Sequence, residues 1–191
     1  PTLYNDDVNV PAVMYGMRVD EKTAEQYVPF GCTEFVIQGQ STGTPNICIN
    51  LLKLLTIYMN DGIDPIDGKR KSGPVPLKKL EEYQTFEEFY DGYKALLDYY
   101  LDLSVKAQYH SYEVMNQHVS FLFTSLLTDD CIARGKALLD GGVRYLGGTN
   151  ETYGNINTCD SLWVIRDLVF NQKKYTLRQL NDAMLANFNG Y

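Results

Sequence analysis

The chain has 191 residues and a formal net charge of −7, with 45% hydrophobic and 21% charged residues. This composition is typical of a folded globular protein and argues against intrinsic disorder. The negative charge argues against nucleic acid or an anionic membrane surface as the main partner, because both attract basic proteins. The sequence contains no apolar run of about 20 residues, the length that spans a bilayer.

The cysteines are widely spaced and form no Cys-x-x-Cys pair (Cys32, Cys48, Cys131 and Cys159). Since no signal peptide is visible, we expect reduced thiols in a cytoplasmic protein rather than disulfides. His110 and His118 lie about 12 Å apart along a predicted helix, too far to share one metal ion. We therefore expect no metal site, and expect the cysteines after Cys32 to serve in packing.

The first third of the chain predicts a short helix, a strand and a loop. Residues 19–27 are predicted to contain a short helix with Asp20 as its N-cap. The stretch "VPFGC" predicts a brief strand that delivers Cys32 to a loop. Residues 36–45 are rich in Gly, Ser and Thr, which predicts a turn-bearing loop.

A buried helix is predicted next. Thr44 and Pro45 suit the N-cap and the first helical position, and Gly62 suits the C-terminal stop. Residues 63–84 then predict a long polar connection. A capping box, Thr85-x-x-Glu88, predicts the start of a helical stretch that continues with interruptions to about residue 123.

The last third predicts two further helices. The stretch "TDDCIARGKALLD" predicts a helix with Thr128 or Asp129 as N-cap and a stop at Gly141-Gly142. Residues 143–161 predict a short strand and then a loop rich in Gly and Asn, and Trp163 is expected in the core. A second capping box, Thr176-x-x-Gln179, predicts the final helix. Short strands that lead into loops and helices indicate a helix-rich α/β fold, either a barrel or a layered sheet.

Several stretches, in this order, carry a resemblance: "LYNDDVNVPAVMYG" with "GCTE" after it, "TFEEFYDGYKALLDYYLDL", "LLTDDCIARGKALLDGGVRYLGG" and "NTCDSLWVIRDLVFNQKKYTLRQLNDAMLANFNGY". Together they are similar to the cysteine-loop region of the glycyl radical enzymes. That family includes pyruvate formate-lyase and the glycerol, choline, isethionate and hydroxyproline lyases and dehydratases. The resemblance spans almost the whole chain.

The resemblance implies that residues 1–191 are one piece, the second half, of a ten-stranded α/β barrel, with the cysteine loop at about 28–45. Cys32 would be the residue that becomes a thiyl radical, and Glu34 the acid/base carboxylate. The alternatives are a buried structural thiol and a loop carboxylate that caps a backbone N–H. Thr33 follows Cys32 where pyruvate formate-lyase has a second cysteine, which favours a lyase or dehydratase over an acyl transferase.

The chain departs from the family pattern in two places. It lacks the Arg-Val-x-Gly-Tyr pattern of the glycyl radical loop, and Gly190-Tyr191 lies in a different context. The chain begins at Pro1 without a methionine, so both ends look cut. We therefore expect it to be inactive without the remainder of the barrel and the glycyl radical domain. Asn46 stands where the dehydratases tend to carry a substrate-binding Asp, which leaves the substrate open.

The resemblance also implies partners. These are a small-molecule substrate and an S-adenosylmethionine iron–sulfur enzyme that installs the glycyl radical, with no cofactor bound directly by this chain. Asn46, Thr149 and Asn150 are candidate substrate-binding residues, because loops and strand ends commonly line such pockets. Open strand edges and apolar faces predict a homo-oligomer. The alternative functions are a non-catalytic binding or assembly module that reuses part of the barrel, and an acyl transferase similar to formate C-acetyltransferase.

Overall fold

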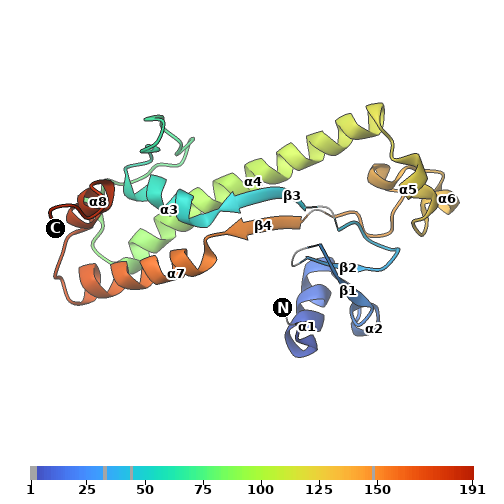
Figure 1. Cartoon of the computed structure of the whole chain (residues 1–191), viewed down its shortest axis with the longest axis horizontal. Helices are drawn as coiled ribbons and strands as arrows, with labels where there is room; N and C mark the ends of the chain where they lie inside the picture. Colours follow the sequence, from blue (N-terminus) through green and yellow to red (C-terminus); the bar gives the residue numbers. More distant parts are fainter. Residues whose placement is uncertain (1–3, 32–33, 44, 148) are drawn as a thin grey trace. The chain divides into compact units, whose positions relative to one another are not determined.

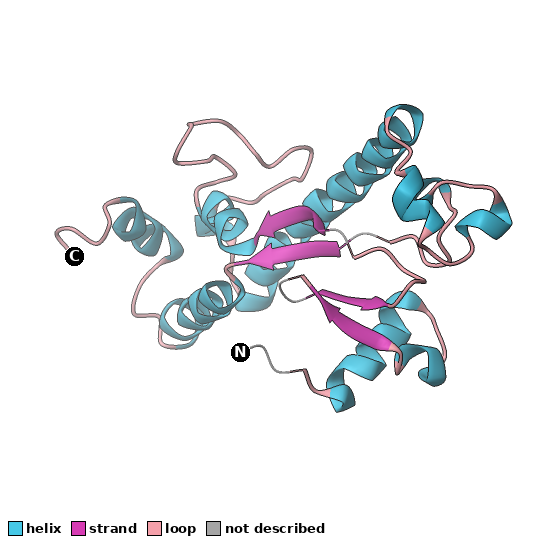
Figure 2. Cartoon of the chain, turned by 45° about the vertical axis from the view of Figure 1, so that its right-hand side comes forward, coloured by secondary structure: helices cyan, strands magenta, loops and turns pink. Residues whose placement is uncertain are grey.

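The computed structural model describes residues 4–31, 34–43, 45–147 and 149–191 (Figure 1). The chain divides into two compact units, residues 1–47 with 105–151 and residues 48–104 with 152–191. Helices dominate over short strands (Figure 2), which confirms the predicted helix-rich α/β class. No helix among the described residues is long and apolar enough to cross a membrane.

The first unit opens with two helices and two strands: α1 (Asp6–Met17), α2 (Glu21–Ala24), β1 (Tyr27–Phe30) and β2 (Glu34–Ile37). The predicted N-cap of α2 is confirmed, because the Asp20 carboxylate accepts the Thr23 N–H at 2.8 Å. Val13, Ala24 and Ile37 form a buried apolar cluster that holds α1 and α2 against β2. This cluster anchors one end of the β1–β2 hairpin.

Strands β1 and β2 pair antiparallel, with Phe30 opposite Glu34 and Val28 opposite Val36. The loop predicted from residue 36 therefore begins later, since Val36 and Ile37 belong to β2 and are buried. These two β-branched residues suit a paired strand better than a turn. The predicted strand before Cys32 is confirmed as β1.

A second strand pair consists of β3 (Pro45–Asn50) and β4 (Thr149–Tyr153), whose arrows point the same way in Figures 1 and 2. The helix predicted from Thr44-Pro45 is therefore wrong in its start, and Thr44 itself lies outside the described residues. A short strand and then a loop were predicted over 143–161; a short strand, β4, is present, but α7 begins at Asn155 where the loop was predicted. In both segments, pairing with a strand distant in the sequence determines the structure rather than the local sequence preference.

Helix α3 (Leu51–Met59) begins only after β3. Asn50 is its N-cap, with a side-chain oxygen that accepts the Lys53 N–H at 2.9 Å. The helix buries five residues: Leu54, Leu55, Ile57, Tyr58 and Met59. The polar connection that follows carries only a short 3-10 turn, η1 (Leu80–Glu82), before the long helix.

Helix α4 (Phe86–His118) has 33 residues and starts where its sequence predicts. Thr85 Oγ1 accepts the Glu88 N–H at 3.2 Å, so the first half of the capping box is confirmed. In the second unit the buried Tyr58 ring packs against Phe89, with ring centroids 4.9 Å apart, and its hydroxyl donates to the Phe89 carbonyl at 2.8 Å. Burial raises the pKa of Tyr58, which keeps it a neutral donor.

Short helices follow α4 in the first unit: α5 (Leu122–Leu126), α6 (Cys131–Arg134) and the 3-10 turn η2 (Leu138–Asp140). The single helix predicted here is wrong, because Gly135 adopts a φ of 60° and ends α6 after four residues. Asp130 occupies the N-cap position of α6, but its side chain makes no capping hydrogen bond to the helix. Its carboxylate instead accepts from Arg144 Nε at 2.8 Å, which fixes the segment after α6.

The second unit closes with α7 (Asn155–Val164), its π-helical continuation (Ile165–Asn171) and α8 (Leu177–Leu185). The capping box of α8 is confirmed, since Thr176 and Gln179 exchange both hydrogen bonds. Trp163 is 65% exposed, so its predicted core position is wrong. Cys48, Cys131 and Cys159 were predicted to serve in packing. Cys131 is buried, which confirms the prediction for it, whereas Cys48 and Cys159 are exposed.

The start of α3 can be tested with Asn50→Ala in the 191-residue chain. Loss of the N-cap should lower the free energy of unfolding by about 1 kcal/mol, measured by denaturant titration, while Asn50→Asp should retain most of it. If the helix began instead at Thr44-Pro45, residue 50 would be a helix-interior position. Asn50→Ala would then stabilise the chain, because alanine has the higher helix propensity.

Candidate active site

The β1–β2 hairpin carries the sequence predicted to be catalytic. Its strands are joined through residues 31–33, of which the structure describes Gly31; Cys32 and Thr33 lie outside the described residues. Glu34 opens β2 and is only 5% exposed. A carboxylate is rarely buried unless it is paired or hydrogen-bonded, so its position beside the cysteine loop marks a functional candidate.

Gly31 packs directly against the Glu34 carboxyl group. A Cβ added at Gly31 would lie 2.7 Å from Glu34 Oε2 and 3.2 Å from Glu34 Cδ. The backbone of Gly31 also has a φ of 60°, a conformation that side chains other than glycine's disfavour. The Glu34 carboxyl group therefore lies directly against the Gly31 backbone.

The hairpin is contacted along both strands by other parts of the first unit. Tyr4 Oη donates to the Glu34 carbonyl at 3.3 Å. Ser41 Oγ accepts the Ile37 N–H at 2.9 Å, at the far end of β2. Gly43 lies so close that a Cβ there would be 2.6 Å from Phe30 Cδ1. These contacts fix the two strands from which the cysteine loop projects.

The predicted substrate-binding residues lie on the other strand pair. Asn46 belongs to β3, and Thr149 and Asn150 belong to β4, so strand pairing brings their backbones together. The side chains of Asn46 and Thr149 lie outside the described part of the chain. Asn150 Oδ1 is buried and has no hydrogen-bond partner in the described structure. Such an acceptor costs about 1–3 kcal/mol until a donor reaches it.

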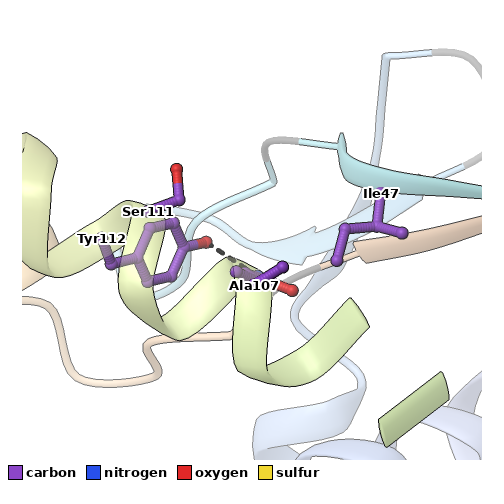
Figure 3. Close-up of a pocket in the computed structure, with 5 residues that line it drawn as sticks. Ile47, Ala107, Ser111 and Tyr112 are labelled. Atoms are coloured by element: carbon purple, nitrogen blue, oxygen red, sulfur yellow. Dashed lines mark hydrogen bonds between the residues drawn. The ribbon is translucent and has the colours of Figure 1, made fainter. Parts of the chain in front are cut away.

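A hollow of about 250 Å³ lies in the first unit between β3 and α4 (Figure 3). It is lined by Ile47, Ala107, Gln108, Ser111 and Tyr112. Tyr112 Oη donates to the Gly147 carbonyl at 2.9 Å and accepts from Gln108 Nε2 at 3.1 Å. Glu34 and Asn150, the predicted site residues whose side chains the structure describes, are not among its lining residues. The sequence feature that could have indicated this hollow is the spacing of Gln108, Ser111 and Tyr112, which places them on one helix face.

Among the residues that the structure describes, no three His, Cys, Asp or Glu side chains cluster in a way that could hold a metal ion. His110 is largely exposed on α4, with Nδ1 3.5 Å from Glu113 Oε2. This pairing between residues three apart is the kind that solvated helix faces commonly carry.

The family pattern described as "Pyruvate formate lyase-like" matches residues 1–191. The chain belongs to this family. It is 29% identical over 191 residues to trans-4-hydroxy-L-proline dehydratase from Clostridioides difficile, covering 100% of this chain and 24% of that protein. It is also 31% identical over 147 residues, 76% of this chain and 16% of the relative, to the 4-hydroxyphenylacetate decarboxylase glycyl radical subunit of Clostridium scatologenes.

Solved structures of glycyl radical enzymes share the fold. The C. difficile hydroxyproline dehydratase structure, with trans-4-hydroxy-L-proline bound, matches with a TM-score of 0.88 and covers 100% of this chain and 24% of that one. The B12-independent glycerol dehydratase from Clostridium butyricum matches with a TM-score of 0.86 at 28% identity, over 99% of this chain and 24% of that one. These likenesses confirm the predicted family and the predicted fold, part of a glycyl radical enzyme barrel. The chain spans about a quarter of the length of these dehydratases.

The contact between Gly31 and Glu34 can be tested against a matched glycine. Gly135 has the same φ of 60° but nothing within 4 Å of an added Cβ. Gly135→Ala should therefore cost only the backbone strain, about 1–2 kcal/mol of unfolding free energy. Gly31→Ala should cost more, because the methyl group also displaces the Glu34 carboxyl.

A double-mutant cycle in the 191-residue chain isolates the second contribution. In a Glu34→Ala background, the cost of Gly31→Ala in denaturant titration should fall to that of Gly135→Ala. Equal costs of the two glycine substitutions in the wild-type background would contradict the contact.

Proposed function

We propose that this chain carries the cysteine loop of a glycyl radical lyase or dehydratase and acts within a complete enzyme of that family. The observation that supports this most directly is Glu34, a carboxylate buried at the first position of β2, two residues after Cys32. Membership of the family supplies the chemical context. The substitution of Thr33 for a second cysteine favours elimination over acyl transfer.

In the proposed reaction Cys32 acts as a thiyl radical. It takes a hydrogen atom from a substrate carbon, so an S–H bond forms and a C–H bond breaks. The substrate radical then loses its leaving group, and the product radical regains a hydrogen atom from the Cys32 thiol. The thiyl radical is restored at the end of each cycle. The glycyl radical that generates it would reside outside these 191 residues and would be installed by a separate activating enzyme.

Glu34 would act as the acid/base group between these two hydrogen transfers. It accepts a proton from one substrate group and delivers a proton to the leaving group, so the carboxylate is unchanged over the cycle. The packing of its carboxyl group against Gly31 supports this role, because it defines the direction from which the proton is exchanged. Burial also excludes water that would compete for the proton.

We propose a small hydroxylated molecule as the substrate, in line with the names of the dehydratases that resemble this chain. Asn46, Thr149 and Asn150 would bind it, with Asn150 Oδ1 accepting a hydrogen bond from a substrate O–H or N–H. The remaining partners would be the activating enzyme, the remainder of the barrel and a second copy of the enzyme. The site of action would be the cytoplasm.

The assignment of Cys32 is tested in the complete activated enzyme. Cys32→Ser should abolish turnover while the glycyl radical signal in electron paramagnetic resonance persists, because the radical is stored elsewhere. Cys159→Ser is the matched control, since Cys159 is an exposed thiol in α7. Glu34→Gln should lower kcat by about 10²- to 10⁴-fold, the usual contribution of general acid–base catalysis. Turnover by Cys32→Ser would show that another group carries the radical.

The role of Asn150 is tested by steady-state kinetics of the same enzyme. Asn150→Ala should raise KM about tenfold, equivalent to about 1.4 kcal/mol, with a smaller effect on kcat. Asn155→Ala is the control, because Asn155 is exposed and its amide donates only to Thr152 Oγ1 at 2.9 Å. An unchanged KM for Asn150→Ala would remove Asn150 from the substrate site.

A further inference from the structure

The hairpin that carries Cys32 and Glu34 needs support from outside its own strands. A two-stranded hairpin is only marginally stable in water. The apolar cluster of Val13, Ala24 and Ile37 supports the end of β2 that is distant from the turn. Glu34 lies at the opposite end, paired with Phe30, and its neighbour Phe35 packs against the rim of the same cluster.

Tyr27, the first residue of β1, is tied to the first turns of α1. Its hydroxyl donates to Asp6 Oδ1 at 2.6 Å and accepts from Asn9 Nδ2 at 3.3 Å. The hydrogen bond to Asp6 raises the pKa of Tyr27, so the phenol remains protonated and continues to donate. The orientation of the Tyr27 ring is thereby fixed by two side chains of α1.

Tyr4 carries this restraint to Glu34. Its ring centroid lies 6.3 Å from that of Tyr27, with an interplanar angle of 37°. Its hydroxyl donates to the Glu34 carbonyl at 3.3 Å. The Tyr27 ring also meets Phe35, the residue after Glu34, in an edge-on contact at 6.3 Å. Contacts therefore run from α1 through two phenols to the Glu34 main-chain carbonyl and to the Phe35 ring.

We propose that Tyr4 and Tyr27 are positioning residues that hold Glu34 in the geometry required for catalysis. This inference rests on the proposed function of the cysteine loop. Tyr4 restrains the Glu34 backbone directly, and Tyr27 acts through Tyr4 and Phe35. Neither phenol takes part in the transfer of hydrogen or protons.

The phenol-to-phenyl variants separate positioning from folding. Tyr4→Phe and Tyr27→Phe delete only the hydroxyl and leave the rings and the apolar cluster of α1, α2 and β2 in place. Tyr15→Phe is the matched control, because Tyr15 lies on α1 and is 90% exposed. The experiment uses the complete activated enzyme with a substrate that wild type turns over.

We expect Tyr4→Phe to lower kcat about tenfold to a hundredfold, the effect of displacing a catalytic group by about an ångström. KM should stay within about twofold, since a pure loss of positioning acts on the chemical step. The glycyl radical signal and the melting temperature should match those of Tyr15→Phe. The double variant with Tyr27→Phe should lose no more than Tyr4→Phe alone, because both hydroxyls act along one path.

The outcomes distinguish this inference from the proposed function. A wild-type kcat for Tyr4→Phe, in an enzyme that Cys32→Ser inactivates, would overturn the positioning role alone. Parallel losses of kcat, radical signal and melting temperature would also overturn it, since they would indicate a merely structural role. Full turnover by Cys32→Ser would overturn the proposed function and the inference together.

Discussion

The buried carboxylate of Glu34 is the constraint around which the first unit is organised. Burying a carboxylate is costly unless its surroundings are fixed, and the hairpin that holds it has only two strands. Neighbouring segments restrain the hairpin. Tyr4, which precedes α1, donates to the Glu34 carbonyl, and Ser41 and Gly43 contact the two strands. The helices α1 and α2 therefore support the hairpin that carries one catalytic candidate.

The second unit depends on a different junction, where each strand of the second pair turns into a helix. Asn50 ends β3 and caps α3, while Gly154 follows β4 and precedes α7 with a φ of 73°. A Cβ at Gly154 would lie 2.9 Å from Leu52 Cβ, so the two junctions pack against each other. This close approach packs the start of α7 against the start of α3, and alternation of strand and helix is the repeating pattern of an α/β barrel.

Local signals predicted the elements that depend on local hydrogen bonds. Asp20, Thr85 and Thr176 each cap a helix where the sequence predicted it. The failures occur where distant contacts decide: Thr44-Pro45 has the chemistry of a helix start but precedes a strand paired with residues about a hundred positions away. The family could be predicted from the order of several segments, and the catalytic roles of Cys32 and Glu34 stay predictions. The bond from Tyr4 to Glu34 could not, because it joins residues 30 positions apart with no motif.

The choice of phenols in the support of Glu34 has a chemical consequence. An acid–base group must pass between its protonated and ionised forms, and a cationic donor placed beside it would hold it ionised. Tyr4 is a neutral donor, and it binds the main-chain carbonyl of Glu34 rather than its carboxyl group. The charged member of the network, Asp6, bonds instead to Tyr27, with the Tyr4 ring between that phenol and the Glu34 carbonyl. The hairpin is therefore restrained from α1 through neutral hydroxyl groups rather than through charged donors.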